Sequence, residues 1–535
     1  MNKYLISFIF IFCFCLNLFS QNHMDLLTTI TGEAYGSGIG SISTTLDWNG
    51  DGYDDLVLFS SYVPQQLEPN FDGSINVYFG GPAFDNVPDI SFLGNYYVEY
   101  DGISLCNAGD MNGDGIDDLA LLKRGPVLDS HSNHFNRILC IYFGGANPDT
   151  TADYQVIFPY QQWEHYSGYV RSLGDINHDG FSDLGYILRP YQYYGSNSFH
   201  IIYGGTMQDV EWMAAGYSSM YGTFQGVGDV NADGIDDFTI GYVIGIRSDR
   251  EFIFRNVLYF GNDTSVYSDS LDMYDGENVW YFSYPAGDVN GDGIDDFVSY
   301  YNGQGSRLYF GSSDFSLENY IFLPGCFNGD SAGNGFVCGD INGSGMNSIV
   351  GGSVEGFAGT GYVKIWMGTS WMNAGADLTL LPPPEAAYDM FGECITMGDY
   401  NGDGYCDIAI SASYHPGASL DIGHVYVYAG SAGLSDPVTE AVQVPKPNSM
   451  SLYPNPLHNA EELTIKFNLR SKTNQSATFT IYNIRGQKAM SFPVTAEQMK
   501  RGSVIFSPNQ LATGIYICTL QIGEQRIHAK LSIVK

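Results

Sequence analysis

The 535-residue sequence predicts an all-β protein: a seven-bladed β-propeller followed by a small C-terminal β-sandwich. Three observations support this fold class. An acidic loop recurs seven times, with its first Asp at successive intervals of 63, 65, 54, 59, 52 and 59 residues. Short apolar runs of β-forming residues surround each copy of the loop. The charge balance reverses near residue 446, which indicates a second domain.

The repeated loop is clearest at residues 110–118. Oxygen-bearing side chains occupy its first, third, fifth and ninth positions, and glycine occupies its sixth position. Three carboxylates this close repel one another unless a cation lies between them. Ca²⁺ takes six to eight oxygen ligands, and the main-chain carbonyl at position seven would add one more. Glycine permits the sharp turn because it has no β-carbon.

The same oxygens recur in six intact loops, so we expect about six structural Ca²⁺ ions. The expected ligands are Asp47, Asn49, Asp51, Tyr53 and Asp55; Asp110, Asn112, Asp114, Ile116 and Asp118; Asp175, Asn177, Asp179, Phe181 and Asp183; Asp229, Asn231, Asp233, Ile235 and Asp237; Asp288, Asn290, Asp292, Ile294 and Asp296; Asp399, Asn401, Asp403, Tyr405 and Asp407. In the sixth of the seven loops, Ser344 and Ser348 replace two carboxylates, and we expect no metal there.

Two alternatives to a β-hairpin calcium loop fit the sequence less well. An EF-hand would require Glu at position twelve and flanking helices, whereas Leu58, Leu121 and Tyr186 stand at that position and β-forming runs follow. Asp, Asn and Gly also form ordinary turns, which would explain a single such loop. Six loops with the same four oxygens favour calcium.

Each repeat carries further strand signals in a fixed order. Before the loop lies a short strand opened by an apolar or aromatic residue and glycine, as at Ile39-Gly40 and Phe391-Gly392. After the loop come an apolar strand, a strand that ends in glycine, and a looser fourth strand. Four short strands in seven repeats predict a propeller over residues 22–430. The seventh repeat has no clear fourth strand, so we expect an N-terminal strand near residues 25–28 to complete it.

The N-terminus predicts an exported protein, and the cysteines do not predict a disulfide framework. Residues 1–20 have the apolar core of a secretory signal peptide, and no later stretch is long and apolar enough to predict a membrane span. Seven cysteines follow the signal peptide and do not form a disulfide framework. Cys394 and Cys406 flank the last loop, where they are either paired across the hairpin or buried as free thiols.

The charge is distributed unevenly along the chain. The whole sequence has 22 Lys+Arg against 59 Asp+Glu. Residues 22–445 hold 10 basic and 55 acidic residues, whereas residues 446–535 hold 11 and 4. The acidic part argues against nucleic acid or anionic lipid as a partner, because phosphates would be repelled.

The run Phe391-Gly392-Glu393-Cys394, followed by the loop at 398–404, resembles the FG-GAP repeat of integrin α-chain propellers and of bacterial FG-GAP/VCBS-type proteins. The resemblance covers roughly residues 25–430. It implies a seven-bladed propeller with calcium in hairpin loops on one face and ligands on the opposite face. The terminal "GAP" is absent, since Leu58-Phe59-Ser60 stands in its place, and this weakens the link to integrins.

A linker over residues 431–450 and a β-sandwich over residues 451–535 follow from turn residues and alternating strands. The sandwich is similar to the type A sorting domain of the type IX secretion system of Bacteroidetes. The matching motifs are Tyr453-Pro454-Asn455-Pro456, Ile484-Arg485-Gly486-Gln487, Leu511-Ala512-Thr513-Gly514-Ile515-Tyr516 and Lys535. This resemblance implies the secretion machinery as a partner and export to the cell surface or medium. An ordinary Ig-like accessory module is the alternative.

Aromatic residues nominate a binding face opposite the calcium loops, because exposed Tyr and Trp contact sugars and proteins. Packing between blades is the alternative for each of them. The candidates are Tyr35, Tyr62, Tyr97, Trp163, Tyr193, Tyr217, Trp280, Tyr388 and Tyr414.

We expect a non-enzymatic protein that binds an extracellular glycan or protein, in adhesion or nutrient capture. A secreted hydrolase or lyase acting on polysaccharide is the alternative, and a structural surface-layer component is a third possibility. No catalytic residue is assigned. Ser331 lies in a GxSxG sequence, but strands surround it where a hydrolase needs a strand and a helix.

Overall fold

The computed structural model divides the chain into two compact units, Met1–Asp436 and Pro437–Lys535. The boundary lies inside the segment 431–450. The structure describes residues 24–32, 38–60, 74–93, 103–127, 135–159, 166–190, 198–212, 219–246, 252–264, 270–273, 281–301, 305–323, 335–353, 361–370, 372, 374–383, 390–413, 423–434, 449–453, 463–468, 477–483, 485, 487–495, 498, 503–507, 511–522 and 525–533. The expected signal peptide lies outside them.

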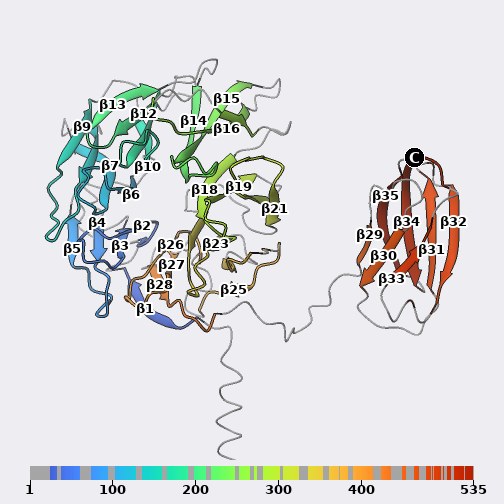
Figure 1. Ribbon diagram of the computed structural model, residues 1–535. Coiled ribbons are helices and arrows are strands. Elements are labelled where there is room, and N and C mark those ends of the chain that lie inside the picture. The colour runs from blue at the N-terminus through green and yellow to red at the C-terminus, as the bar shows by residue number, and fades with distance from the viewer. Residues whose placement is uncertain are drawn as a thin grey trace, which may run out of the picture. The chain divides into compact units, whose positions relative to one another are not determined.

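Seven four-stranded antiparallel sheets form the first unit (Figure 1), and they are the blades of the predicted propeller. Blades one to three comprise β2 (Ile42–Leu46), β3 (Asp55–Ser60), β4 (Ser74–Tyr78) and β5 (Ile90–Leu93); β6 (Ser104–Gly109), β7 (Asp118–Val127), β8 (Phe135–Tyr142) and β9 (Tyr154–Phe158); and β10 (Tyr166–Gly174), β11 (Asp183–Pro190), β12 (Ser198–Tyr203) and β13 (Gln208–Trp212).

Blades four to seven repeat this order. They comprise β14 (Ser219–Gly228), β15 (Asp237–Ile246), β16 (Phe252–Tyr259) and β17 (Ser270–Asp272); β18 (Tyr281–Gly287), β19 (Asp296–Tyr301), β20 (Gly305–Tyr309) and β21 (Tyr320–Leu323); β22 (Phe336–Gly339), β23 (Ser348–Ser353), β24 (Tyr362–Trp366) and β25 (Leu378–Leu380); and β26 (Ile395–Gly398), β27 (Asp407–Ala412), β28 (His424–Tyr428) and β1 (Leu26–Thr31).

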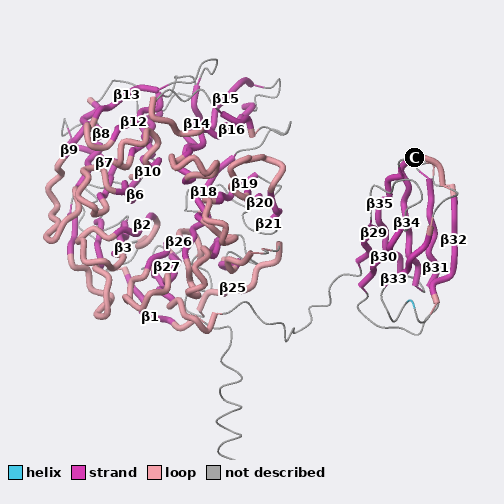
Figure 2. The backbone as a smooth tube through the Cα atoms, in the orientation of Figure 1, coloured by secondary structure: helices cyan, strands magenta, loops and turns pink. Residues whose placement is uncertain are grey.

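The first strand of each blade contacts the first strand of the next. These contacts join β2 to β6, then β10, β14, β18, β22 and β26 in turn, and β26 contacts β2 again. Figure 2 shows the strands of this first unit arranged around a common centre. The predicted seven-bladed propeller is confirmed.

The N-terminal strand completes the last blade, as predicted. β1 pairs antiparallel with β28, with Thr29 opposite Tyr426 and Thr31 opposite His424. The outermost strand of this blade therefore comes from the beginning of the chain, and its other three strands come from the end of the propeller sequence.

Apolar side chains fill the spaces between blades. β3, β23 and β27 are buried along their whole length, because a blade packs against neighbours on both faces. Between blades one and two, for example, Val57 and Phe59 lie in one buried cluster with Leu119 and Leu121. Stacking of the blades thus explains why these strands are buried on both faces.

The second unit consists of two sheets around its own core. One has the strand order β29-β30-β33 and the other β32-β31-β34-β35, and Phe479, Cys518 and Leu531 are among the side chains buried in this unit's core. The strands are β29 (Ser449–Tyr453), β30 (Leu463–Asn468), β31 (Ala477–Asn483), β32 (Lys488–Val494), β33 (Ser503–Phe506), β34 (Gly514–Ile522) and β35 (Gln525–Ile533).

Two further expectations concern the described residues. Of the two alternatives for Cys394 and Cys406, the structure shows free thiols and no disulfide between them; Cys394 is buried and Cys406 is partly buried. The Cys394 thiol instead lies 3.2 Å from the Ser43 hydroxyl of the first blade. None of the described segments forms a helix long and apolar enough to cross a membrane.

Candidate metal centre

Each acidic loop joins the first strand of its blade to the second, at one end of the hairpin. In the first blade it connects β2 to β3, and the pairing of Leu46 with Asp55 closes the hairpin around it. The loop is therefore a hairpin tip, as predicted, and all of the expected ligand residues are described. Position nine is the first residue of the second strand.

Hydrogen bonds from the loop's own backbone gather its side-chain oxygens. Asp47 Oδ1 and Oδ2 accept the N–H groups of Asp51 and Gly52 at 3.1 and 2.9 Å. Asn49 Oδ1 also accepts the Asp51 N–H, at 2.8 Å, and Asp51 Oδ1 accepts the Tyr53 N–H, at 3.0 Å. Each carboxylate oxygen has a second lone pair, so these bonds leave acceptor capacity for a cation.

This arrangement repeats in all six intact loops. In the fourth loop, Asp229 accepts from Asp233 and Gly234 at 3.1 and 2.7 Å, and Asp233 accepts from Ile235 at 3.0 Å. The glycine at position six has a φ of +89° in the first loop and +86° in the fourth, and a Cβ there would meet nothing within 4 Å. Backbone conformation, and not space, is therefore what requires glycine.

The carboxylates at position nine are fully buried, and they brace the blade. Asp237 Oδ1 accepts the N–H of Gly261, the glycine that follows the third strand, at 2.9 Å. Its Oδ2 accepts the N–H of Val230 at position two, at 3.1 Å. The equivalent glycine bonds span 2.7–3.0 Å in the other intact loops. The sequence predicts these residues only as metal ligands, and their hydrogen bonds to the third strand become visible only in the structure.

Burial raises the pKa of each position-nine carboxyl, although the backbone N–H groups lower it in part. The pKa of Asp55 rises to about 7, and that of Asp237 to about 8. Repulsion by the carboxylate at position five raises the pKa further in all six loops, and the carboxylate at position one adds to it in every intact loop but the first. Nearby positive charge would favour the ionised form of such a group.

The donor set fits a hard cation in its chemistry. It consists entirely of oxygen, which suits Ca²⁺ better than softer metals. Among the described residues, no group of three or more His, Cys, Asp or Glu side chains is arranged to hold an ion by itself. An ion in these loops would therefore depend also on the Asn oxygen at position three and the carbonyl at position seven.

In several loops, an Asp at position eight accepts a hydrogen bond from the backbone of a neighbouring loop. This role was not predicted from the sequence. Asp117 Oδ2 accepts the N–H of Asp47, the first residue of the preceding loop, at 3.4 Å. Asp236 and Asp295 make the equivalent bonds to Asp175 and Asp229, at 2.8 and 3.1 Å. The sequence does carry a signal for this role, because several loops have Asp at both position eight and position nine.

Backbone hydrogen bonds reinforce this junction. In six of the seven blades, the residue that follows the glycine after the third strand donates its N–H to the carbonyl at position two of the neighbouring blade's loop. The N···O distances are 2.9 Å for Gly81 to Tyr400, 2.9 Å for Gly145 to Trp48, 2.7 Å for Gly205 to Met111, 3.0 Å for Asn262 to Ile176, 3.0 Å for Ser312 to Val230 and 2.9 Å for Ser431 to Ile341.

The sixth loop keeps the same shape with fewer charges. Asp340 accepts the N–H groups of Ser344 and Gly345 at 3.0 and 2.7 Å. The Ser344 hydroxyl accepts the Met346 N–H at 3.2 Å, in place of an Asp carboxylate. The Ser348 hydroxyl accepts the Gly368 N–H at 3.3 Å, as position nine does elsewhere.

The nine aromatic residues of the expected binding face lie outside the described residues, as does Ser331. The described strands before several of them, such as β3 before Tyr62 and β27 before Tyr414, begin at the acidic loop and end away from it.

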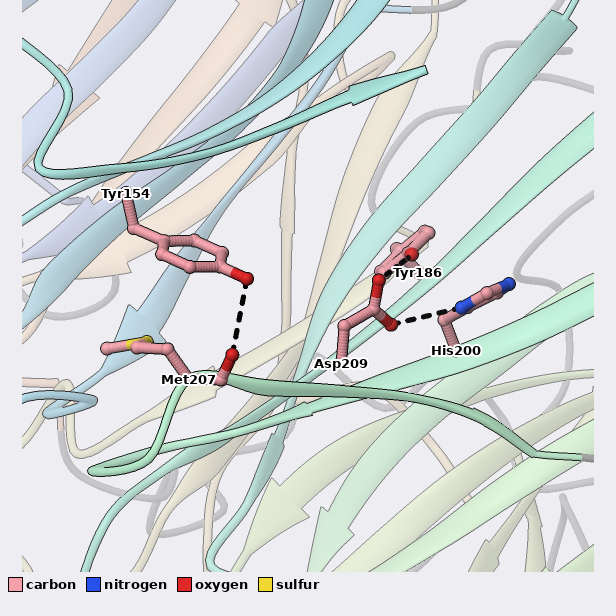
Figure 3. Close-up of polar contacts among 5 residues, drawn as sticks. All are labelled: Tyr154, Tyr186, His200, Met207 and Asp209. Atoms are coloured by element: carbon pink, nitrogen blue, oxygen red, sulfur yellow. Dashed lines mark hydrogen bonds and ion pairs between the residues drawn. The ribbon is translucent and has the colours of Figure 1, made fainter. Parts of the chain in front are cut away.

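A polar network between blades two and three was also missed by sequence reasoning (Figure 3). Asp209 Oδ2 accepts from the buried Tyr186 hydroxyl at 2.7 Å, and its Oδ1 lies 3.0 Å from His200 Nδ1. Tyr154 of blade two donates to the carbonyl of Met207 at 3.2 Å. Burial works to raise the pKa of Asp209, but the bonds from His200 and Tyr186 outweigh it and lower that pKa. The network satisfies a buried hydroxyl and joins three strands of one blade.

Two comparisons with known proteins bear on this architecture. Residues 451–535 match the family of the secretion system C-terminal sorting domain. The chain is also 24% identical over 211 residues to integrin alpha-5 of Xenopus laevis. That alignment covers 36% of this chain and 19% of the integrin subunit, so the chain spans about a fifth of its relative's length.

Proposed function

Because its tail marks the chain for export by the type IX secretion system to the cell surface or medium, we propose that its propeller is a calcium-stabilised module that binds an extracellular glycan or protein. The observation that carries the calcium part is the repeated cage of loop oxygens. Six loops gather the same side chains and end in a fully buried carboxylate. Uncompensated buried charge is unfavourable, so a divalent ion in each loop would stabilise the fold.

In this proposal the six ions are structural. The side chains at positions one, three, five and nine and the carbonyl at position seven would hold each ion. When bound, the ion supplies positive charge that neutralises the hairpin tip, while the chain itself supplies the junction bonds at positions two and eight. Adhesion or nutrient capture would then be the task of the opposite face.

Calcium dependence is tested by thermal unfolding of the full chain with Ca²⁺ and with a chelator. A ligand that binds only the folded form stabilises it by about 2.7 kcal/mol per site at a hundredfold excess over Kd. We expect the propeller transition to fall strongly on chelation and to recover with Ca²⁺. An unchanged melting temperature, together with no calcium in metal analysis, would rule the calcium part out.

The binding role is tested on a glycan array and a panel of host-surface proteins with the full chain. Trp163→Ala and Trp280→Ala should weaken binding, whereas Leu381→Ala should not, although Leu381 is 70% exposed. Turnover of a polysaccharide that is lost with a single carboxylate substitution would instead establish the alternative, a secreted hydrolase or lyase.

A further inference from the structure

The sorting unit has an outward sheet face with exposed isoleucines. On β34 the side chains alternate, and Tyr516, Cys518 and Leu520 point into the core. Ile515 and Ile517 point the other way and are 46% and 40% exposed. Folding of the unit accounts for the buried set but not for two adjacent exposed isoleucines on one strand.

The segment that contains Ile515 shows the contrast clearly. Leu511 is buried in the core, and the Tyr516 hydroxyl donates to the Ala512 carbonyl at 3.0 Å. Both residues are explained by packing within the unit. Ile515 lies between them and contributes little to that packing.

The register places a basic and apolar row across this face. Tyr482 of β31 lies opposite both Lys488 of β32 and Ile517 of β34, and Ile517 lies opposite Lys530 of β35. The side chain of Lys488 is exposed. Asn483 stabilises the turn between β31 and β32 next to this row. Its Oδ1 accepts the N–H groups of Arg485 and Gln487 at 3.0 Å each.

No acidic residue occupies the two neighbouring register rows of the described strands. The register positions of these two rows are Ser491, Thr480, Thr519 and His528, and Pro493, Thr478, Gln521 and Arg526. Residues 446–535 as a whole have 11 basic and 4 acidic residues, in a protein whose net charge is −37. An acidic partner would therefore be attracted to this unit and not to the rest of the chain.

We propose that the outer face of the β32-β31-β34-β35 sheet, centred on Ile515, Ile517 and Lys488, is the surface that the secretion machinery reads. Its occupant is a protein subunit of that machinery with an acidic rim around an apolar patch. The two isoleucines supply the buried centre of the contact, and Lys488 supplies the charged edge. This inference rests on the sorting role of the tail and is independent of calcium and of the propeller's ligand.

The test is export of the full chain from a bacterium with an active type IX system. Ile515→Thr/Ile517→Thr keeps β-branched side chains but removes the apolar patch, and it should lower the exported fraction by about tenfold or more, as loss of a central contact does. Ile505→Thr on β33 is the matched control, because Ile505 is 51% exposed on the other sheet. Export of this control should stay within about twofold of the parent, since isolated surface changes cost little. Lys488→Glu should reduce export and Lys488→Arg should not.

Limited proteolysis of the purified full-length variants establishes that their tails are folded. Normal export of the folded double variant would overturn the proposal, as would an equal loss with Ile505→Thr. Salt-sensitive binding of the purified chain to phosphatidylglycerol vesicles, lost in the double variant, would assign the face to lipid and overturn the protein partner. Export of a chain without residues 451–535 would instead refute the sorting role itself.

Discussion

Asp54 Oδ2 accepts the backbone N–H of Asp399 at 2.8 Å, although 345 residues separate them in the chain. The first residue of the last loop is thereby bonded to position eight of the first loop. Tyr53 reinforces the junction, because a Cβ at Gly402 would stand 2.4 Å from Tyr53 Cε1. The junction between the first and last blades thus uses the same bond as three of the junctions between consecutive blades, those made by Asp117, Asp236 and Asp295.

Asp54→Ala should weaken this junction. It leaves the Asp399 N–H without its acceptor, and a buried polar group without a partner costs about 1–3 kcal/mol. We expect that loss in the free energy of unfolding, measured by urea denaturation in excess Ca²⁺. Asp54→Asn retains an oxygen acceptor and should lose less. Asp314→Ala, at an exposed acid, is the control, and an equal effect there would contradict the junction role.

Ser344→Asp/Ser348→Asp should convert the sixth loop into a metal site. The loop already has the backbone of the other six, with Gly345 at a φ of +78°, so only the charges are missing. Isothermal titration calorimetry should count one Ca²⁺ more than in the parent protein. The single variant Ser344→Asp leaves position nine uncharged and should bind more weakly, and unchanged stoichiometry in the double variant would refute the assignment.

Ala232→Gly should stabilise the fourth loop. Ala232 has a φ of +62° at position four, where Gly50 and Gly402 have φ values of +69° and +72°. A left-handed conformation costs a residue with a β-carbon about 1–2 kcal/mol, part of which the greater freedom of glycine in the unfolded chain offsets. We expect a net gain of about 0.5–1 kcal/mol by urea denaturation. The reverse change Gly402→Ala should destabilise the protein, since it adds the clash with Tyr53.

Glu393→Gln should change how stability depends on pH. Burial raises the pKa of Glu393 above 4.5, although a hydrogen bond from the Ser413 hydroxyl lowers it in part. The folded protein therefore binds this proton more tightly than the unfolded chain does. The contribution of Glu393 to stability is greatest below pH 4.5 and is lost as pH rises through the folded-state pKa.

At neutral pH the ionised, partly buried Glu393 destabilises the fold, so Glu393→Gln should raise the melting temperature at pH 8 relative to the parent. The gain should shrink toward pH 4.5, where both side chains are neutral in the folded state. Glu318→Gln, at an exposed acid, should show no such trend. A gain that is equal at both pH values would contradict the raised pKa.

The repeated loop made the propeller predictable, because one unit repeated seven times has few ways to bury all of its strands. The pairing of β1 with β28 followed from the missing fourth strand of the last repeat. The second role of the position-nine carboxylates could not be predicted in this way. Gly261, which Asp237 braces, lies 24 residues further along the chain, and only the folded blade brings the two together.

Junction residues between blades were missed for a related reason. In the sequence, Asp54 and Asp117 look like part of a local acidic run. In the structure, their carboxylate oxygens accept backbone N–H groups from a different repeat. The sequence left a disulfide and free thiols as alternatives for Cys394 and Cys406, because closeness in a hairpin does not fix the direction of the side chains. Cys394 points toward Ser43 of the first blade instead.

The position of β1 has a consequence for biosynthesis. The outermost strand of the last blade, β1, is synthesised before all the other described strands. Its partner β28 leaves the ribosome about 400 residues later. A chain that is interrupted before β28 leaves β1 without a partner, and a chain that loses β1 leaves a bare sheet edge on its final blade. The propeller can close only when both β1 and β28 are present in the chain. An incomplete chain therefore differs from a complete one in the exposed strand edges of its last blade.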